Sequence, residues 1–199
     1  MRNGILYTIF DWILEKLKFF NLVELFKYIA KRIYSKDRIL SSRLGVDLFI
    51  ILKWLTVVSL WAFSVNNKFV DILIWYLIAT NLYTYFYYHS WTKDLEKGNF
   101  DLDRIKRRFF NLMLAISFNI LCFAYLFAVP FSINFQWSNI LLRNKDALFS
   151  SIANSLTVDF QAMEPITNTG HALTLFETVI TFIFLTIILS NSTPQIKTE

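Results

Sequence analysis

The sequence predicts an all-α membrane protein with four transmembrane helices, and its composition and the layout of its apolar residues carry that prediction. The chain of 199 residues is 55% hydrophobic, and its mean hydropathy is +0.44. Its apolar residues lie in long blocks, whereas the charged residues, 18% of the chain, stand mostly in the gaps between these blocks. A soluble domain of this length rarely has such a composition. We therefore read the long blocks as membrane spans.

Four of the blocks are long enough to cross a hydrocarbon core of about 30 Å, which needs about 20 helical residues. They cover residues 44–65, 69–90, 109–133 and 171–191. A further apolar stretch, 147–158, has only about a dozen residues and is too short to span. Such a segment is expected to be an interfacial helix or a re-entrant helix that enters and leaves on the same side.

The distribution of lysine and arginine predicts the orientation of the spans. Residues 1–43 contain nine basic side chains and residues 91–108 contain six, whereas the other connections contain few. Basic loops stay on the cytoplasmic side. We therefore expect both termini and the 91–108 loop to be cytoplasmic. The short apolar stretch then enters from outside.

The N-terminal region is predicted to form a basic amphipathic helical segment. Between residues 5 and 34 the pattern is helical, with Ile9, Ile13, Leu17 and Phe20 on one face. Such a helix usually lies on a leaflet with anionic headgroups, and docking onto a cytoplasmic protein is the alternative. The candidate residues for contact with lipid or a protein partner are Lys16, Lys27, Lys31, Arg32, Arg104, Lys106, Arg107 and Arg108.

These patterns divide the chain into five segments. The third span, the short apolar stretch and the fourth span are taken as one segment, because the stretch lies between these two spans. The segments are a cytoplasmic amphipathic segment (1–43), a two-helix membrane hairpin (44–90), a basic loop (91–108), a unit holding the last two spans (109–192) and a short cytoplasmic tail (193–199).

The segment from Asp146 onward resembles the pore module of the two-helix potassium-channel family. In that family a pore helix beginning Ala-Leu leads into a Thr-Val-Gly-Tyr-Gly-Asp filter. A Pro-x-Thr-x-x-Gly linker and an inner helix with an early glutamate follow. The resemblance implies a tetramer around a central axis. The matching positions without a gap are Ala147, Leu148, Thr157, Val158, Pro165, Thr167, Gly170 and Glu177.

The filter positions depart from that family and change the function that the resemblance implies. Asp159 and Gln161 stand where the family has glycine, Phe160 stands at the tyrosine position and Ala162 at the aspartate position. A carbonyl ladder needs residues that tolerate positive φ, so we do not expect a potassium-type filter. A pore would instead be lined by side chains. Fourfold symmetry would gather four Asp159 carboxylates, and Glu164 would add a second ring. The alternative is that Asp159 ends the short helix and Glu164 is simply solvated.

The predicted inner helix also lacks a hinge. Many relatives carry a glycine four residues after the glutamate, and Thr181 stands at that position. Without glycine or proline nothing kinks the helix. Phe182 and Phe184 are candidates for a hydrophobic gate, although phenylalanines in spans more often face lipid or neighbouring helices.

Two functions follow from these expectations. The first is a homotetrameric, channel-like protein with a side-chain-lined pore, regulated by a separate cytoplasmic protein. The second is a non-conducting membrane sensor or scaffold for a soluble effector. In size, topology and altered filter the chain also resembles membrane subunits of bacterial antiviral systems of the Kiwa type. The single cysteine and the distant His89 and His171 offer no metal-ligand spacing. We expect no enzyme activity, no cofactor and no nucleic-acid partner.

Overall fold

The computed structural model describes residues 4–34, 38–91 and 102–192. Residues 92–101 of the predicted basic loop, the predicted tail 193–199, and the side chains of Arg104 and Arg108 lie outside this description. The elements in order are α1 (Ile5–Leu17), η1 (Lys18–Phe20), α2 (Leu22–Ile33), α3 (Arg38–Ala62), α4 (Lys68–Phe86), η2 (Tyr87–Trp91), α5 (Leu102–Ala128), η4 (Ser132–Asn134), β1 (Phe135–Trp137), η5 (Ile140–Leu142), α6 (Arg143–Ser155), β2 (Met163–Pro165) and α7 (Asn168–Ser192).

Among the described residues, four helices are long and apolar enough to cross a membrane, which confirms that prediction. Their apolar parts are Leu40–Ala62, Lys68–Phe86, Phe109–Ala128 and Asn168–Ile187. The third span ends five residues earlier than predicted, because Pro130 cannot continue a helix. The second ends at Phe86, where the backbone widens into the π-helical turn η2. These helices indicate a membrane-embedded protein.

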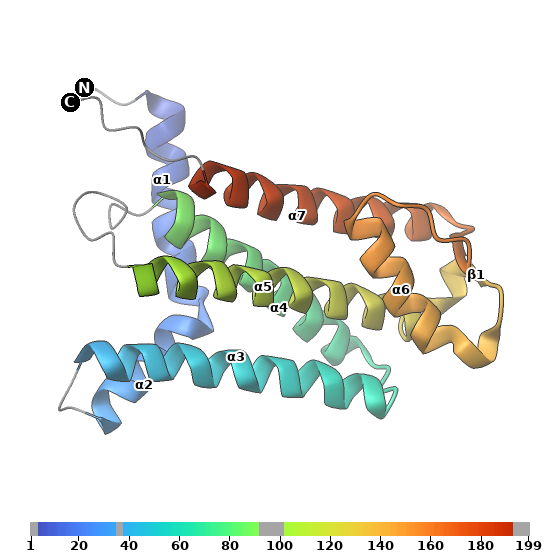
Figure 1. The fold of residues 1–199 in the computed structure, drawn as a ribbon, viewed down its shortest axis with the longest axis horizontal. Helices are drawn as coiled ribbons and strands as arrows, with labels where there is room; N and C mark the ends of the chain where they lie inside the picture. Colours follow the sequence, from blue (N-terminus) through green and yellow to red (C-terminus); the bar gives the residue numbers. More distant parts are fainter. Residues whose placement is uncertain (1–3, 35–37, 92–101, 193–199) are drawn as a thin grey trace. The chain divides into compact units, whose positions relative to one another are not determined.

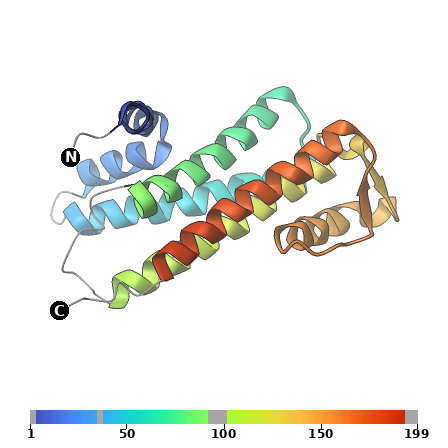
Figure 2. The same ribbon diagram turned by 90° about the horizontal axis from the view of Figure 1, so that it is seen from above.

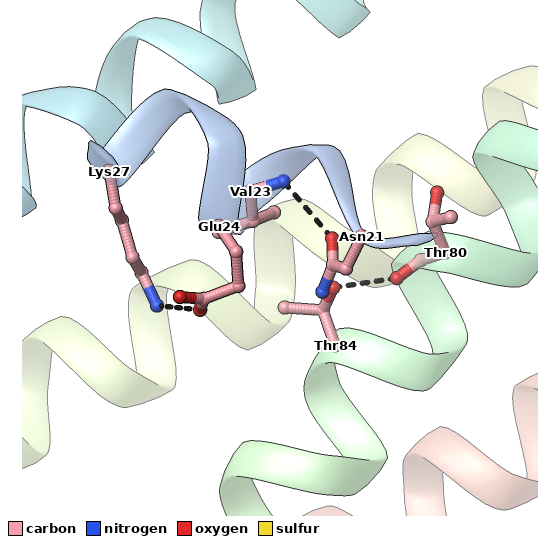
Figure 3. A network of polar contacts seen from close by, with 6 residues as sticks. All are labelled: Asn21, Val23, Glu24, Lys27, Thr80 and Thr84. Carbon is pink, nitrogen blue, oxygen red and sulfur yellow. Dashed lines mark hydrogen bonds and ion pairs between the residues drawn. The ribbon is translucent and has the colours of Figure 1, made fainter. Parts of the chain in front are cut away.

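The chain forms two compact units, Met1–Thr56 and Val57–Glu199, and the boundary falls inside α3. In the first unit, the predicted N-terminal helical segment is divided into two helices. The break lies at Asn21, whose side chain accepts a hydrogen bond from the Val23 N–H (3.1 Å) and so begins α2 (Figure 3). Within α2, Lys27 pairs with Glu24 at 2.7 Å (Figure 3). An N-cap residue in mid-segment therefore outweighed the continuous helical pattern.

In the same unit, α2 packs closely against α3. A Cβ atom on Gly45 would lie 2.8 Å from the Phe26 carbonyl oxygen and 3.0 Å from the Ala30 Cβ, so only glycine permits this approach. The Phe26 and Phe49 rings meet four residues further along α3, with centroids 5.3 Å apart. The α2–α3 contact therefore runs along the first turns of the first span.

In the second unit, α5 supplies much of the buried core. The side chains from Cys122 to Ala128 are fully buried. Between α4 and α5, the Asn81 amide donates to the Asn119 side chain and to the Ala115 carbonyl, both at 3.0 Å. Within α4, the Thr84 hydroxyl donates to the Thr80 carbonyl (2.6 Å; Figure 3). These bonds satisfy polar groups inside the span, as inter-helix and intra-helix hydrogen bonds commonly do.

The short helix α6 lies against the C-terminal part of α5 and the N-terminal part of α7 (Figures 1 and 2). The segments on either side of it meet in a small antiparallel sheet, in which β1 pairs with β2. The register places Phe135 opposite Pro165 and Trp137 opposite Met163. Because β1 follows α5 and β2 precedes α7, α6 and its flanking loops form an excursion that starts and ends at this sheet.

Candidate functional site

The C-terminal end of α6 lies beside the middle of α7. The Ser155 hydroxyl, in the last turn of α6, lies 3.5 Å from the Thr181 hydroxyl, and the Ser151 hydroxyl oxygen lies 2.9 Å from the Ile120 carbonyl oxygen of α5. Thr181 is thirteen residues after the first residue of α7, Asn168, or about 20 Å along the helix axis. The helix α6 therefore reaches well into the apolar lengths of α5 and α7.

A buried carboxyl group fixes α6 in this position. Glu177 of α7 is 1% exposed. Its carboxyl oxygens accept hydrogen bonds from the Asn154 amide at 2.6 Å and from the Ser151 hydroxyl. A buried carboxyl without such partners would cost several kcal/mol. The carboxyl group thus joins two consecutive turns of α6 to α7.

Asn154 makes further contacts with the same helix. Its amide also donates to the Thr174 carbonyl (2.9 Å), and its carbonyl oxygen accepts from the Thr178 hydroxyl (3.0 Å). Every polar atom of this side chain is therefore engaged with α7. We call these five residues, Ser151, Asn154, Thr174, Glu177 and Thr178, the Glu177 cluster.

The loop that follows α6, residues 156–162, does not have the backbone of a potassium filter. The Val158 N–H donates to the Ala153 carbonyl (2.8 Å), which ends α6, and Thr157 between them has a φ of 56°. Asp159 and Gln161, at the predicted glycine positions, do not have positive φ. These two residues therefore do not carry the strain that a potassium-type filter would impose on them, and the left-handed residue of the loop is Thr157.

The far end of this loop is tied to the segment before α6. The Ser138 N–H donates to the Ala162 carbonyl (3.1 Å), and the Ser138 hydroxyl donates to the Gln161 carbonyl (3.2 Å). These two hydrogen bonds therefore fasten the end of the loop to the segment before α6.

The side chains of the loop are largely exposed in the single chain. Thr157, Asp159 and Gln161 are exposed, and Val158 is 60% exposed. Phe160 is half-buried and its ring meets Phe149 of α6, with centroids 6.0 Å apart. Exposed polar side chains therefore follow the C-terminal end of α6. It brings together the predicted filter-like residues Thr157, Val158, Asp159, Phe160 and Gln161 but places Glu164 apart from them, exposed in β2 and opposite Gln136.

The Pro-x-Thr-x-x-Gly linker has a structural role. The Thr167 side chain accepts a hydrogen bond from the Gly170 N–H (3.1 Å) and donates to the Asn134 side chain (2.8 Å). The Asn134 carbonyl accepts from the Ile166 N–H (3.0 Å). Pro165 is the last residue of β2, where it pairs with Phe135. The linker therefore begins α7 and fastens it to the segment after α5.

The two phenylalanines predicted as a gate lie in different environments. Phe184 is 0% exposed and packs with Tyr85, Leu112 and Ala115 in the core between α4, α5 and α7. Phe182 is 68% exposed. A side chain enclosed by its own subunit is not suited to closing an axis between subunits, so a gate at Phe184 does not fit this packing. Thr181 is also buried, so Phe182 remains as the gate candidate.

The described basic candidate residues have different local surroundings. Lys27 is paired with Glu24, and Lys16 lies over the Trp12 ring, 5.9 Å from its centroid. Lys31, Arg32 and Lys106 are exposed, and Arg107 is half-buried. Among the described residues, no three His, Cys, Asp or Glu side chains are grouped so that they could hold a metal ion.

We expect that Thr157→Asn raises the thermal unfolding temperature of the purified protein. Asparagine tolerates the left-handed conformation better than a β-branched threonine, and the relief is about 0.5–1 kcal/mol. Circular dichroism during heating in detergent measures it. Thr169→Asn, an exposed threonine in the first turn of α7, is the matched control and should give no gain. A lower unfolding temperature for Thr157→Asn than for this control would contradict the assigned backbone.

Comparison of the chain with family models, with curated proteins and with solved structures found no match in any of the three.

Proposed function

We propose that the protein is a channel-like homotetramer in which the 156–162 loops of four copies surround a common axis lined by side chains. Its activity would be controlled through a separate cytoplasmic protein, and its location would be a bacterial inner membrane with both termini inside. In this proposal α6 is a re-entrant helix. The proposal rests on the altered filter-like sequence together with the position of the loop.

The observation that carries the proposal is the exposure of the loop at the depth reached by α6. Loop residues 157–159 come two to four residues after Ser155, and Ser155 lies beside Thr181 within the apolar length of α7. Non-helical backbone at membrane depth is tolerated only where protein covers it or where it borders a water-filled cavity. The exposed Asp159 carboxylate likewise needs a protein cover or a water-filled cavity at that depth. A ring of copies around the loop meets both needs, since each copy covers its neighbour and the loops enclose water.

Side chains rather than carbonyl groups would select the ions in such a pore. The Gln161 and Ala162 carbonyls are occupied by Ser138, whereas the Asp159 side chain is exposed. A ring of carboxylates attracts cations and repels anions. We therefore infer a cation preference that depends on Asp159.

The experiment is current recording from purified protein in planar bilayers under a salt gradient. We expect a cation-selective current in the wild type, and a reversal potential that moves towards zero for Asp159→Asn, because the carboxylates are lost. Asp11→Asn, which removes a carboxylate from α1, is the charge-matched control and should leave the reversal potential unchanged. An unchanged selectivity in Asp159→Asn would exclude a pore lined by this residue. Native mass spectrometry that gives monomers or dimers instead of tetramers would exclude the assembly.

The unbroken course of α7 favours a second candidate function, a non-conducting sensor or scaffold. The helix runs from Asn168 to Ser192 without interruption, and Thr181 offers no hinge. A pore that cannot open would leave a tetramer that holds a soluble effector, for example in bacterial antiviral defence. A tetramer without current at any voltage, together with a soluble protein that co-purifies only when residues 1–40 are present, would favour this candidate.

A further inference from the structure

The first helix, α1, exposes most of its apolar side chains. On a helical projection Leu6, Ile9, Phe10, Ile13 and Leu17 share one side, and we call this side the apolar face of α1. All five are exposed, from 41% for Ile13 to 84% for Leu6. On one flank of this face Leu14 is buried and the charged Asp11 and Lys18 are half-buried, whereas Thr8 and Glu15, on the opposite side, are exposed.

A helix on the surface of a water-soluble protein shows the opposite pattern, with its apolar side buried. Contiguous exposed apolar surface of this kind marks contact with a membrane or another protein. Phe20, shortly after α1, is exposed as well and lies on the same side. The face therefore needs an occupant.

The position of the neighbouring helix, α2, indicates what covers the apolar face of α1. The close contact of α2 with α3 is at Gly45, five residues or about 8 Å along the helix from Leu40, where the first span begins. An element packed against the first turns of a span lies at the boundary between headgroups and acyl chains, which is the depth of interfacial helices, about 5–10 Å. Residues 22–33 of α2 are thus at the membrane surface, and α1 precedes them by a short turn.

We propose that α1 lies in the plane of the bilayer, with its apolar face in the acyl region of the cytoplasmic leaflet. With 13 residues, or about 20 Å, the helix is too short to span, so it must lie along the surface. Lys16 and Lys18 can then reach the phosphate groups of anionic lipids, and the Lys16 ammonium group lies over the Trp12 ring. The leaflet follows from the predicted orientation of the basic segments. The proposal does not depend on conduction or on the number of subunits.

The test is depth measurement on the full chain in nanodiscs that contain anionic lipid. In a Cys122→Ala background, single cysteines at Ile9 and Ile13 report on the apolar face, and cysteines at Thr8 and Glu15 are the matched controls on the polar side of the helix. Spin labels at Ile9 and Ile13 should be several-fold more accessible to oxygen, which dissolves in acyl chains, than to an aqueous nickel complex. Labels at Thr8 and Glu15 should show the reverse.

Quenching of Trp12 tests the same point without the cysteine background. Brominated lipids should quench the wild type more than Trp12→Phe, and the difference is the contribution of this one indole ring. Labels that are all open to the nickel complex would place α1 in water. Labels at Ile9 and Ile13 that are closed to both reagents, with Trp12 unquenched, would assign the face to a protein partner or a second copy. Either result would overturn the proposal.

Discussion

Asn154→Asp is expected to lower the free energy of unfolding by about 3 kcal/mol, because it turns the central contact of the Glu177 cluster into a repulsion. The amide nitrogen that lies 2.6 Å from the Glu177 carboxyl becomes a carboxylate oxygen. The same change removes the donor for the Thr174 carbonyl. A half-buried carboxyl group at position 154 then faces the buried Glu177 carboxyl without the amide donor between them. Thermal unfolding in detergent, followed by circular dichroism, measures the loss.

Two further variants separate the loss of the Asn154–Glu177 contact from the general effect of placing an aspartate in α6. Asn144→Asp places the same substitution at an exposed position of α6 and should change stability by less than about 0.5 kcal/mol. In the double variant Asn154→Asp/Glu177→Gln, the glutamine amide can donate to the new aspartate, so part of the stability should return. A double-mutant cycle gives the coupling energy between the two residues. A coupling near zero would show that the two side chains do not meet.

Hydropathy was sufficient to predict the main elements of the fold. The four spans and the short helix between the last two follow from block length, since the energetic cost of exposing backbone or charge to lipid leaves few alternatives. The ends of these elements were harder to place. Helix α6 begins at Arg143, four residues before the predicted Ala147, because Asn139 begins a helical turn ahead of the apolar run by capping the Leu141 N–H.

The small sheet could not be predicted from the sequence. Its strands, β1 and β2, have three residues each, too few for a period of two to be recognisable. Their pairing joins segments about 28 residues apart, so it depends on the placement of α6 between them. The break between α1 and α2 had a local signal, since Asn21 is a preferred N-cap residue, but it was obscured by the apolar residues on both sides.

The candidate site was predicted in part. The resemblance singled out Glu177, and the structure adds Ser151 and Asn154 as its partners. Serine and asparagine in a short helix carry no signal of their own, and only the rotation of α6 against α7 shows which face they occupy. The same limit applies to Phe182 and Phe184. Both are apolar and two residues apart, and the packing of α7 alone decides that Phe184 is enclosed and Phe182 exposed.

Gly170→Ala is expected to destabilise the protein by about 2 kcal/mol, although alanine is the better helix former. A Cβ atom at this position would lie 2.6 Å from the Asn134 carbonyl oxygen and 3.1 Å from the Pro165 Cβ. The Asn134 carbonyl cannot retreat freely, since it accepts the Ile166 N–H, while the Asn134 side chain is held by Thr167. Thermal unfolding of the purified variant measures the loss.

Whether Gly170→Ala stabilises or destabilises the protein shows which effect is larger, the helix propensity of alanine or the steric contact with Asn134. Within a helix, replacing glycine by alanine normally gains about 1 kcal/mol, so a stabilised Gly170→Ala would mean that Asn134 does not lie over the start of α7. Gly4→Ala is the control for steric contact, because no atom lies within 4 Å of its added Cβ, and as an N-cap change in α1 it should cost less than about 1 kcal/mol. Thr167→Val keeps the volume but removes the hydrogen bonds to Gly170 and Asn134. If the linker fastens α7 to the segment after α5, both Thr167→Val and Gly170→Ala should loosen the same element, and their effects should not add.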